Sequence, residues 1–136
     1  MLEQVLLNLI RNGMEITHDV SEVFKQLTGL GKARTLKHLW QAPFTLQPNV
    51  VAAIQAEAET ARNGGKGRIV AKMNSLVERE VINALYEASQ AGVEIDLIVR
   101  GVCMLRPGVP GLSDKIRVRS IIGRFLEHHR VMSFSC

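Results

Sequence analysis

Two short apolar runs joined by one helical stretch constrain the fold of this chain most. The runs at 68–73 and 95–99 have the length and composition of buried strands. Between them, residues 76–91 have the periodicity of a helix that stops at Gly92. A strand, a crossover helix and a second strand imply parallel pairing. The sequence therefore predicts an α/β sheet whose ligands gather at the carboxyl ends of its strands.

The second half of the chain continues this sheet. Residues 100–111 form a long loop with two prolines and three glycines, and loops of this length are often functional. Further strands are predicted at 116–122 and 131–134, with a short connection over 123–128. The sequence stops two residues after the last predicted strand, so we expect an incomplete sheet.

Short helices are predicted before the sheet. Apolar residues at helical spacing indicate an amphipathic helix over 1–14 and a second helix over 20–27. An irregular run around Pro43 indicates the start of a domain, because proline disfavours helix at the residue before it. A third helix is expected over 48–62, with proline in its first turn and Asn63-Gly64-Gly65 after its end.

Composition limits the classes of protein to consider. The chain has 136 residues, 46% of them hydrophobic, which allows one modest globular domain. Its two cysteines lack the spacing of a metal site or disulfide framework, so we expect a reduced, cytoplasmic chain, free or in a membrane-associated complex. No apolar run approaches the roughly 20 residues that span a bilayer. Aromatic residues make up only 4%, which argues against a reader of single-stranded nucleic acid, and we expect no specific nucleic-acid partner.

Arginines gather after the second strand of the crossover unit. Arg100 directly follows that strand, and further arginines lie within the next 30 positions: Arg106, Arg117, Arg119, Arg124 and Arg130. Guanidinium groups stay charged and bind phosphate oxygens bidentately, so this region predicts an anionic partner. Alternation places Arg117 and Arg119 on one face of a strand. A solvated basic strand explains these two equally well.

Two other pairs of residues could bind phosphate. His128 and Arg130, two positions apart, can share a face in a geometry suited to a phosphoryl group. Lys72 and Asn74 close the first strand, where the start of the crossover helix would favour an anion. Alternatively, Asn74 or Ser75 merely caps that helix. No acid pair or Ser-His-Asp order favours a hydrolase.

Four blocks of the sequence resemble polyphosphate kinases. Residues 97–113, continued by 116–128, are similar to the last catalytic domain of that family. Residues 37–44, with Ala-Pro-Phe, and 69–77, with Ala-Lys-Met-Asn-Ser-Leu, resemble two further blocks in the same order. The resemblance implies a phospholipase D-like fold. It also implies reversible transfer of the terminal phosphate of ATP to polyphosphate through a phosphohistidine.

The resemblance assigns residues in this chain. Arg100 and His128 match the family's nucleotide-contacting arginine and histidine, and Arg130 stands where phospholipases D have a lysine. The candidate supporting phosphate contacts are Arg130, Arg106, Arg117, Arg119, Lys72 and Asn74. ATP, Mg²⁺ and an oligomeric assembly are implied by the family. The phosphorylated histidine and magnesium-associated arginines belong to the preceding domain, so we predict no catalytic residue and no metal ligand here.

The same resemblance divides the chain into three parts. Residues 1–14 are predicted to be an extraneous helix, 15–35 the tail of the preceding catalytic domain, and 36–136 a truncated C-terminal catalytic domain. Residues 2–14 separately resemble the asparagine-box helix of sensor histidine kinases, with Asn8 and Asn12 one turn apart. The expectation is a polyphosphate kinase fragment that keeps part of the nucleotide and phosphate site and is inactive alone. The alternatives are a non-enzymatic polyanion-binding module and a non-functional remnant.

Overall fold

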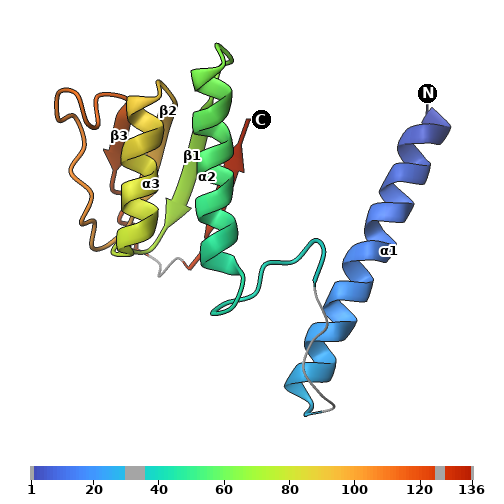
Figure 1. Cartoon of the computed structure of the whole chain (residues 1–136). Helices are drawn as coiled ribbons and strands as arrows, with labels where there is room; N and C mark the ends of the chain where they lie inside the picture. The colour runs from blue at the N-terminus through green and yellow to red at the C-terminus, as the bar shows by residue number, and fades with distance from the viewer. Residues whose placement is uncertain (1, 30–35, 125–127, 136) are drawn as a thin grey trace. The chain divides into compact units, whose positions relative to one another are not determined.

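The computed structural model describes residues 2–29, 36–124 and 128–135, with side chains from Gly13 onward. The chain divides into two compact units, Met1–Leu46 and Gln47–Cys136. The described residues form three helices and four strands: α1 (Leu2–Leu27), α2 (Leu46–Arg62), β1 (Arg68–Met73), α3 (Arg79–Gln90), β2 (Glu94–Val99), β3 (Ile116–Arg119) and β4 (Val131–Phe134). Figure 1 labels all of these elements except β4.

The second unit is built on an open four-stranded sheet of order β3-β2-β1-β4. Strands β1 and β2 are parallel with α3 as the crossover helix, and β3 is parallel to β2. Strand β4 runs antiparallel to β1 and places Ser133 opposite Val70. The predicted α/β class and its parallel crossover unit are therefore confirmed.

One face of the sheet carries the hydrophobic core. Helices α2 and α3 lie on the same side of the sheet (Figure 1). Burial alternates along β1 and β2, so every second side chain faces these helices. The core consists chiefly of Val50, Ile54 and Ala58 from α2, Leu85 and Ala88 from α3, and Ile69, Ala71, Ile95, Leu97 and Val99 from the strands.

Within the second unit, the opposite face of the sheet is only partly covered. It carries half-buried Val70, Asp96 and Ile98 between exposed arginines of β1 and β3. We call this surface the open face; it comprises Arg68, Val70, Asp96, Ile98, Arg117 and Arg119. The alternation therefore places the most buried apolar side chains against the helices and the charged side chains of these strands on the open face.

The first unit contains one helix rather than the two that were predicted. Helix α1 runs without interruption from Leu2 to Leu27, so the separate helices over 1–14 and 20–27 were wrong. Residues 15–19 contain neither proline nor glycine, and the single Gly13 costs only about 1 kcal/mol in a helix. The side chains of Asn8 and Asn12, which carry the histidine kinase resemblance, lie outside the described residues.

Asp19 fastens the segment after α1 to that helix. Its side chain is 1% exposed, and Oδ2 accepts hydrogen bonds from the backbone N–H groups of Lys37, His38 and Leu39 at 2.8, 2.6 and 3.1 Å. The hydrogen bond from the N–H of His38, together with those from Leu39 and Lys37, holds the pKa of Asp19 below its usual value, although burial opposes this shift. His38 Nε2 also lies 2.9 Å from Glu15 Oε2.

Two predicted element boundaries in the second unit differ from the observed ones by three residues. The crossover helix begins at Arg79 rather than at residue 76, because Leu76 forms a parallel bridge with Cys103 and is held in extended backbone. The third strand ends at Arg119 rather than at residue 122, since the Ser120 hydroxyl turns back to the Arg100 carbonyl. The connection predicted over 123–128 includes residues 125–127, which lie outside the described residues. Among the described helices, none has the length and hydropathy needed to cross a membrane.

Candidate functional site

The ends of four strands meet at one edge of the sheet. Strands β1, β2 and β3 are parallel, so their carboxyl ends share this edge. Because β4 is antiparallel to β1, the segment that enters β4 reaches the same edge. We call the polar group gathered there the edge cluster; it comprises Asn74, Arg100, Ser120, His128 and Arg130. The position agrees with the predicted location of ligands in a parallel sheet.

Backbone hydrogen bonds fix Asn74 and Arg100 side by side. The N–H of Arg100 donates to the Met73 carbonyl at 3.1 Å, and the N–H of Gly101 donates to the Asn74 carbonyl at 2.7 Å. A Cβ at Gly101 would lie 3.0 Å from that carbonyl oxygen, so the close approach favours glycine. The Ser120 hydroxyl donates to the Arg100 carbonyl at 3.2 Å and joins β3 to the cluster.

His128 joins the cluster through its side chain and its backbone. Its Nδ1 lies 3.2 Å from Asn74 Nδ2, and Arg130 Nη1 donates to its carbonyl oxygen at 2.8 Å. His128 and Arg130 both precede β4 rather than lying in a strand. Arg130 therefore bonds the backbone of His128, a role that the spacing of the two residues did not predict.

Arg100 carries a donor that the described residues leave unmatched. Its Nε is buried and finds no hydrogen-bond partner in the described part of the chain. A buried donor without an acceptor costs about 1–3 kcal/mol, so native structures rarely leave one unused. An anionic oxygen would satisfy this donor, and a guanidinium group suits phosphate oxygens in particular. The arrangement at Arg100 thus fits a phosphate-bearing ligand.

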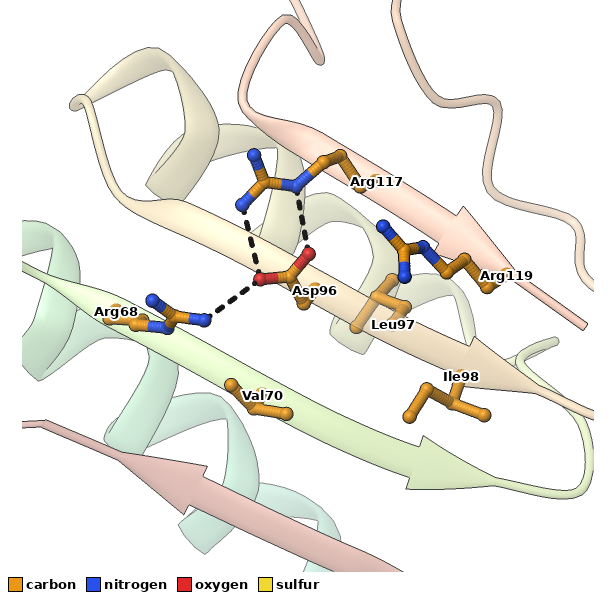
Figure 2. Close-up of a pocket in the computed structure, with 7 residues that line it drawn as sticks. All are labelled: Arg68, Val70, Asp96, Leu97, Ile98, Arg117 and Arg119. Carbon is orange, nitrogen blue, oxygen red and sulfur yellow. Dashed lines mark hydrogen bonds and ion pairs between the residues drawn. The ribbon is translucent and has the colours of Figure 1, made fainter.

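The open face holds a second group of charges. Arg117 Nε and Nη2 donate to Asp96 Oδ1 and Oδ2 at 2.8 and 3.1 Å, and Arg68 Nη2 donates to Asp96 at 3.2 Å (Figure 2). Arg117 also lies 3.3 Å from Glu94. Its hydrogen bonds hold the pKa of Asp96 below the usual value, and Asp96 raises that of Arg117.

Arg117 and Arg119 lie on one face of β3, as predicted from their alternation. Together with Arg68 and Asp96 they line a shallow hollow of about 390 Å³ on the open face. Much of the positive charge of Arg117 is already matched by Asp96 and Glu94. Sequence reasoning missed Asp96, although the polar residue inside the apolar run 95–99 was a usable signal.

Two of the other predicted phosphate contacts, Arg106 and Lys72, are not members of the edge cluster. Arg106 lies in the loop between β2 and β3, where its N–H donates to the Tyr86 hydroxyl at 2.9 Å. Lys72 is half-buried and alternates onto the side of the open face. Asn74 does not cap α3, because Glu78 occupies the N-cap position. The start of α3 at Arg79 also removes the helix N-terminus that was expected beside Asn74.

A metal site among the described residues would be a cluster of His, Cys, Asp and Glu side chains. The described residues contain no group of three His, Cys, Asp or Glu side chains that could hold a metal ion. Mg²⁺ is bound mainly through carboxylates and phosphates.

Comparison with known proteins identifies the family. The family described as "Polyphosphate kinase C-terminal domain 2" matches residues 39–136. Polyphosphate kinases of Burkholderia vietnamiensis and Paraburkholderia phytofirmans are 62% and 64% identical to this chain over 126 residues. In both cases the match covers 93% of this chain and 18% of the relative.

A solved structure gives the same result. The crystal structure of polyphosphate kinase from Porphyromonas gingivalis matches with a TM-score of 0.79 and 40% sequence identity. It covers 88% of this chain and 20% of that protein, so the present sequence spans about a fifth of its relatives. The chain belongs to the polyphosphate kinase family, and its residues 39–136 match C-terminal domain 2 of that family.

Proposed function

We propose that this chain supplies one part of the nucleotide and phosphate site of a polyphosphate kinase. Arg100 and His128 bind phosphate oxygens of ATP or of polyphosphate. The observation that carries this proposal is the edge cluster, in which Arg100 and His128 share one sheet edge and Asn74 contacts the His128 ring. The name shared by the similar proteins supports the choice of substrates.

The proposed chemistry is electrostatic. Transfer of a phosphoryl group spreads negative charge over its oxygens, and fixed positive donors stabilise that charge. Arg100 neutralises charge on the phosphate, and its Nε–H receives an acceptor that the described residues do not provide. His128 donates to a phosphate oxygen or helps to move a proton. The phosphorylated histidine belongs to the preceding catalytic domain, so this chain alone does not complete the transfer.

Other features follow as parts of the same proposal. The sheet is taken as part of a phospholipase D-like domain that begins near residue 36, and residues 15–35 as the tail of the preceding catalytic domain. Assembly as an oligomer is proposed from the family resemblance. Mg²⁺, when bound with ATP, would neutralise phosphate charge, and its ligands are expected outside the described residues.

A polyanion-binding module without enzymatic function is the second candidate. The open face favours it, because it presents Arg68, Arg117 and Arg119 around one hollow. Asp96 lowers the charge available to a polyanion there. Competition between polyphosphate and RNA over a salt series separates the two candidates, since contacts that release counterions give a steep salt dependence. Equal displacement by RNA would favour the second candidate.

Calorimetric titration with a non-hydrolysable ATP analogue and with polyphosphate tests the leading proposal. The double variant Arg100→Ala, His128→Ala should lose binding while its circular dichroism stays that of the folded chain. Arg62→Ala is the matched control, because Arg62 ends α2, which leads to the opposite edge of the sheet, and pairs only with Glu59 among the described residues. Absence of binding by the unmodified chain would contradict the proposal and indicate a non-functional remnant.

A further inference from the structure

His128 is held from two directions in the edge cluster. Its imidazole Nδ1 lies 3.2 Å from Asn74 Nδ2, and its carbonyl accepts a 2.8 Å hydrogen bond from Arg130. The main chain at Asn74 is held in place, because its backbone carbonyl accepts the 2.7 Å bond from Gly101 N–H. His128 is exposed, so the contact of its Nδ1 with the Asn74 amide is what restricts rotation of the ring.

The chemistry of the amide determines where the imidazole proton sits. The Nδ2 of asparagine only donates hydrogen bonds, so the His128 nitrogen facing it must offer its lone pair. A neutral imidazole with a lone pair on Nδ1 carries its proton on Nε2. The opposite ring nitrogen is then a donor, as a phosphate oxygen requires.

We propose that Asn74 is a positioning residue that orients the His128 ring and keeps its proton on Nε2, ready to donate to a phosphate oxygen. The identity of that ligand rests on the proposed function, whereas the position of the proton does not. Asn74 would act through His128 and would not itself touch the phosphate.

Nitrogen-15 NMR of the histidine imidazoles in the ligand-free chain tests the position of the proton. The measurement is made at a pH at which the rings are neutral, and His128 is identified by its disappearance in His128→Ala. In the unmodified chain His128 should carry its proton on Nε2. In Asn74→Asp a carboxylate acceptor replaces the amide donor, so the proton should move to Nδ1.

Ser75→Asp is the matched control, since it adds the same charge at the neighbouring exposed residue. It should leave the proton of His128 on Nε2. A proton on Nδ1 in the unmodified chain would overturn the inference, and this result needs no variant to fold. A proton that remains on Nε2 in folded Asn74→Asp would overturn it too.

Ligand affinity gives a separate readout. Asn74→Ala frees the ring of His128 and should weaken polyphosphate binding roughly two- to tenfold, the worth of one hydrogen bond. If the unmodified chain binds and Asn74→Ala binds equally well, Asn74 has no positioning role. If the unmodified chain binds neither ligand, the proposed function fails, while the NMR result still decides where the His128 proton lies.

Discussion

The Ser135 hydroxyl donates a 3.0 Å hydrogen bond to the carboxylate of Glu57, although 78 residues separate the two in sequence. The same Glu57 oxygen accepts the backbone N–H of Arg68 at 3.0 Å, and the Glu57 side chain is fully buried. One carboxylate thus joins α2, the start of β1 and the end of β4. His128 lies shortly before β4 and Ser135 directly after it. The contact between Ser135 and Glu57 therefore holds the strand that positions His128.

Glu57→Ala should destabilise the second unit by about 1–3 kcal/mol, because it removes the buried carboxylate that the Arg68 N–H and the Ser135 hydroxyl share. Their remaining contacts are the 2.9 Å bond from the Arg68 N–H to Ser135 Oγ and the 3.4 Å bond from Ser135 Oγ to the Lys66 carbonyl. The midpoint of urea unfolding measures the effect. Glu59→Ala is the control, since Glu59 lies on the same helix with its side chain 65% exposed. Equal midpoints for the two variants would show that Glu57 contributes no more than a surface residue.

Ionisation of Asp96 on the open face makes the stability of the folded chain depend on pH. Its pKa is lowered in the folded chain, chiefly by the hydrogen bonds from Arg117. The folded state therefore binds fewer protons than the unfolded state at acid pH, and stability rises with pH there. The contribution is complete above about pH 4, the usual pKa of aspartate, and is lost as the pH falls through the lower folded value.

Asp96→Asn should remove that part of the acid dependence. Urea unfolding at several pH values below neutrality measures the difference between the variant and the unmodified chain. We expect a difference of about 0.2–1 kcal/mol per ion pair at pH 7, because Arg68 and Arg117 are largely exposed, and a smaller difference in acid. Asp114→Asn is the control at an exposed carboxylate outside the sheet. A difference that grows as the pH falls would contradict the assignment.

Gly101→Ala tests the close contact between Gly101, which follows β2, and Asn74, which follows β1. The added Cβ would lie 3.0 Å from the Asn74 carbonyl oxygen, which is backbone and cannot rotate away. We expect a loss of about 1 kcal/mol of stability and weaker ATP-analogue binding by calorimetry. Gly123→Ala is the control, as nothing lies within 4 Å of its added Cβ. Unchanged stability and affinity in Gly101→Ala would show that the edge tolerates displacement.

The part of the fold set by local patterns was predictable from the sequence. The runs at 68–73 and 95–99 and the helix between them carry their own periodicity, so the parallel crossover followed directly. The continuity of α1 was not apparent, because its apolar pattern weakens over residues 15–19 while the backbone stays helical. A segment can therefore be helical even where its sequence lacks a clear apolar pattern.

The site was predictable only in part. Arg100 could be placed at the edge because it follows a strand whose direction was known. The contact between Asn74 and His128 depends on β4 pairing antiparallel to β1, and nothing in the short run 131–134 indicates its partner or direction. The pair of Asp96 and Arg117 likewise depends on the register of β2 and β3.

Arg100→Lys distinguishes the shape of the guanidinium from its charge. Lysine keeps the positive charge but loses Nε and the planar fork that bonds two phosphate oxygens at once. If Arg100 acts by that geometry, affinity for polyphosphate should fall about tenfold, equivalent to about 1.4 kcal/mol, with the salt dependence of binding nearly unchanged. Arg62→Lys, away from the edge cluster, should leave both quantities as they are. Full affinity in Arg100→Lys would mean that charge alone suffices, and the buried Nε would then need an acceptor other than the ligand.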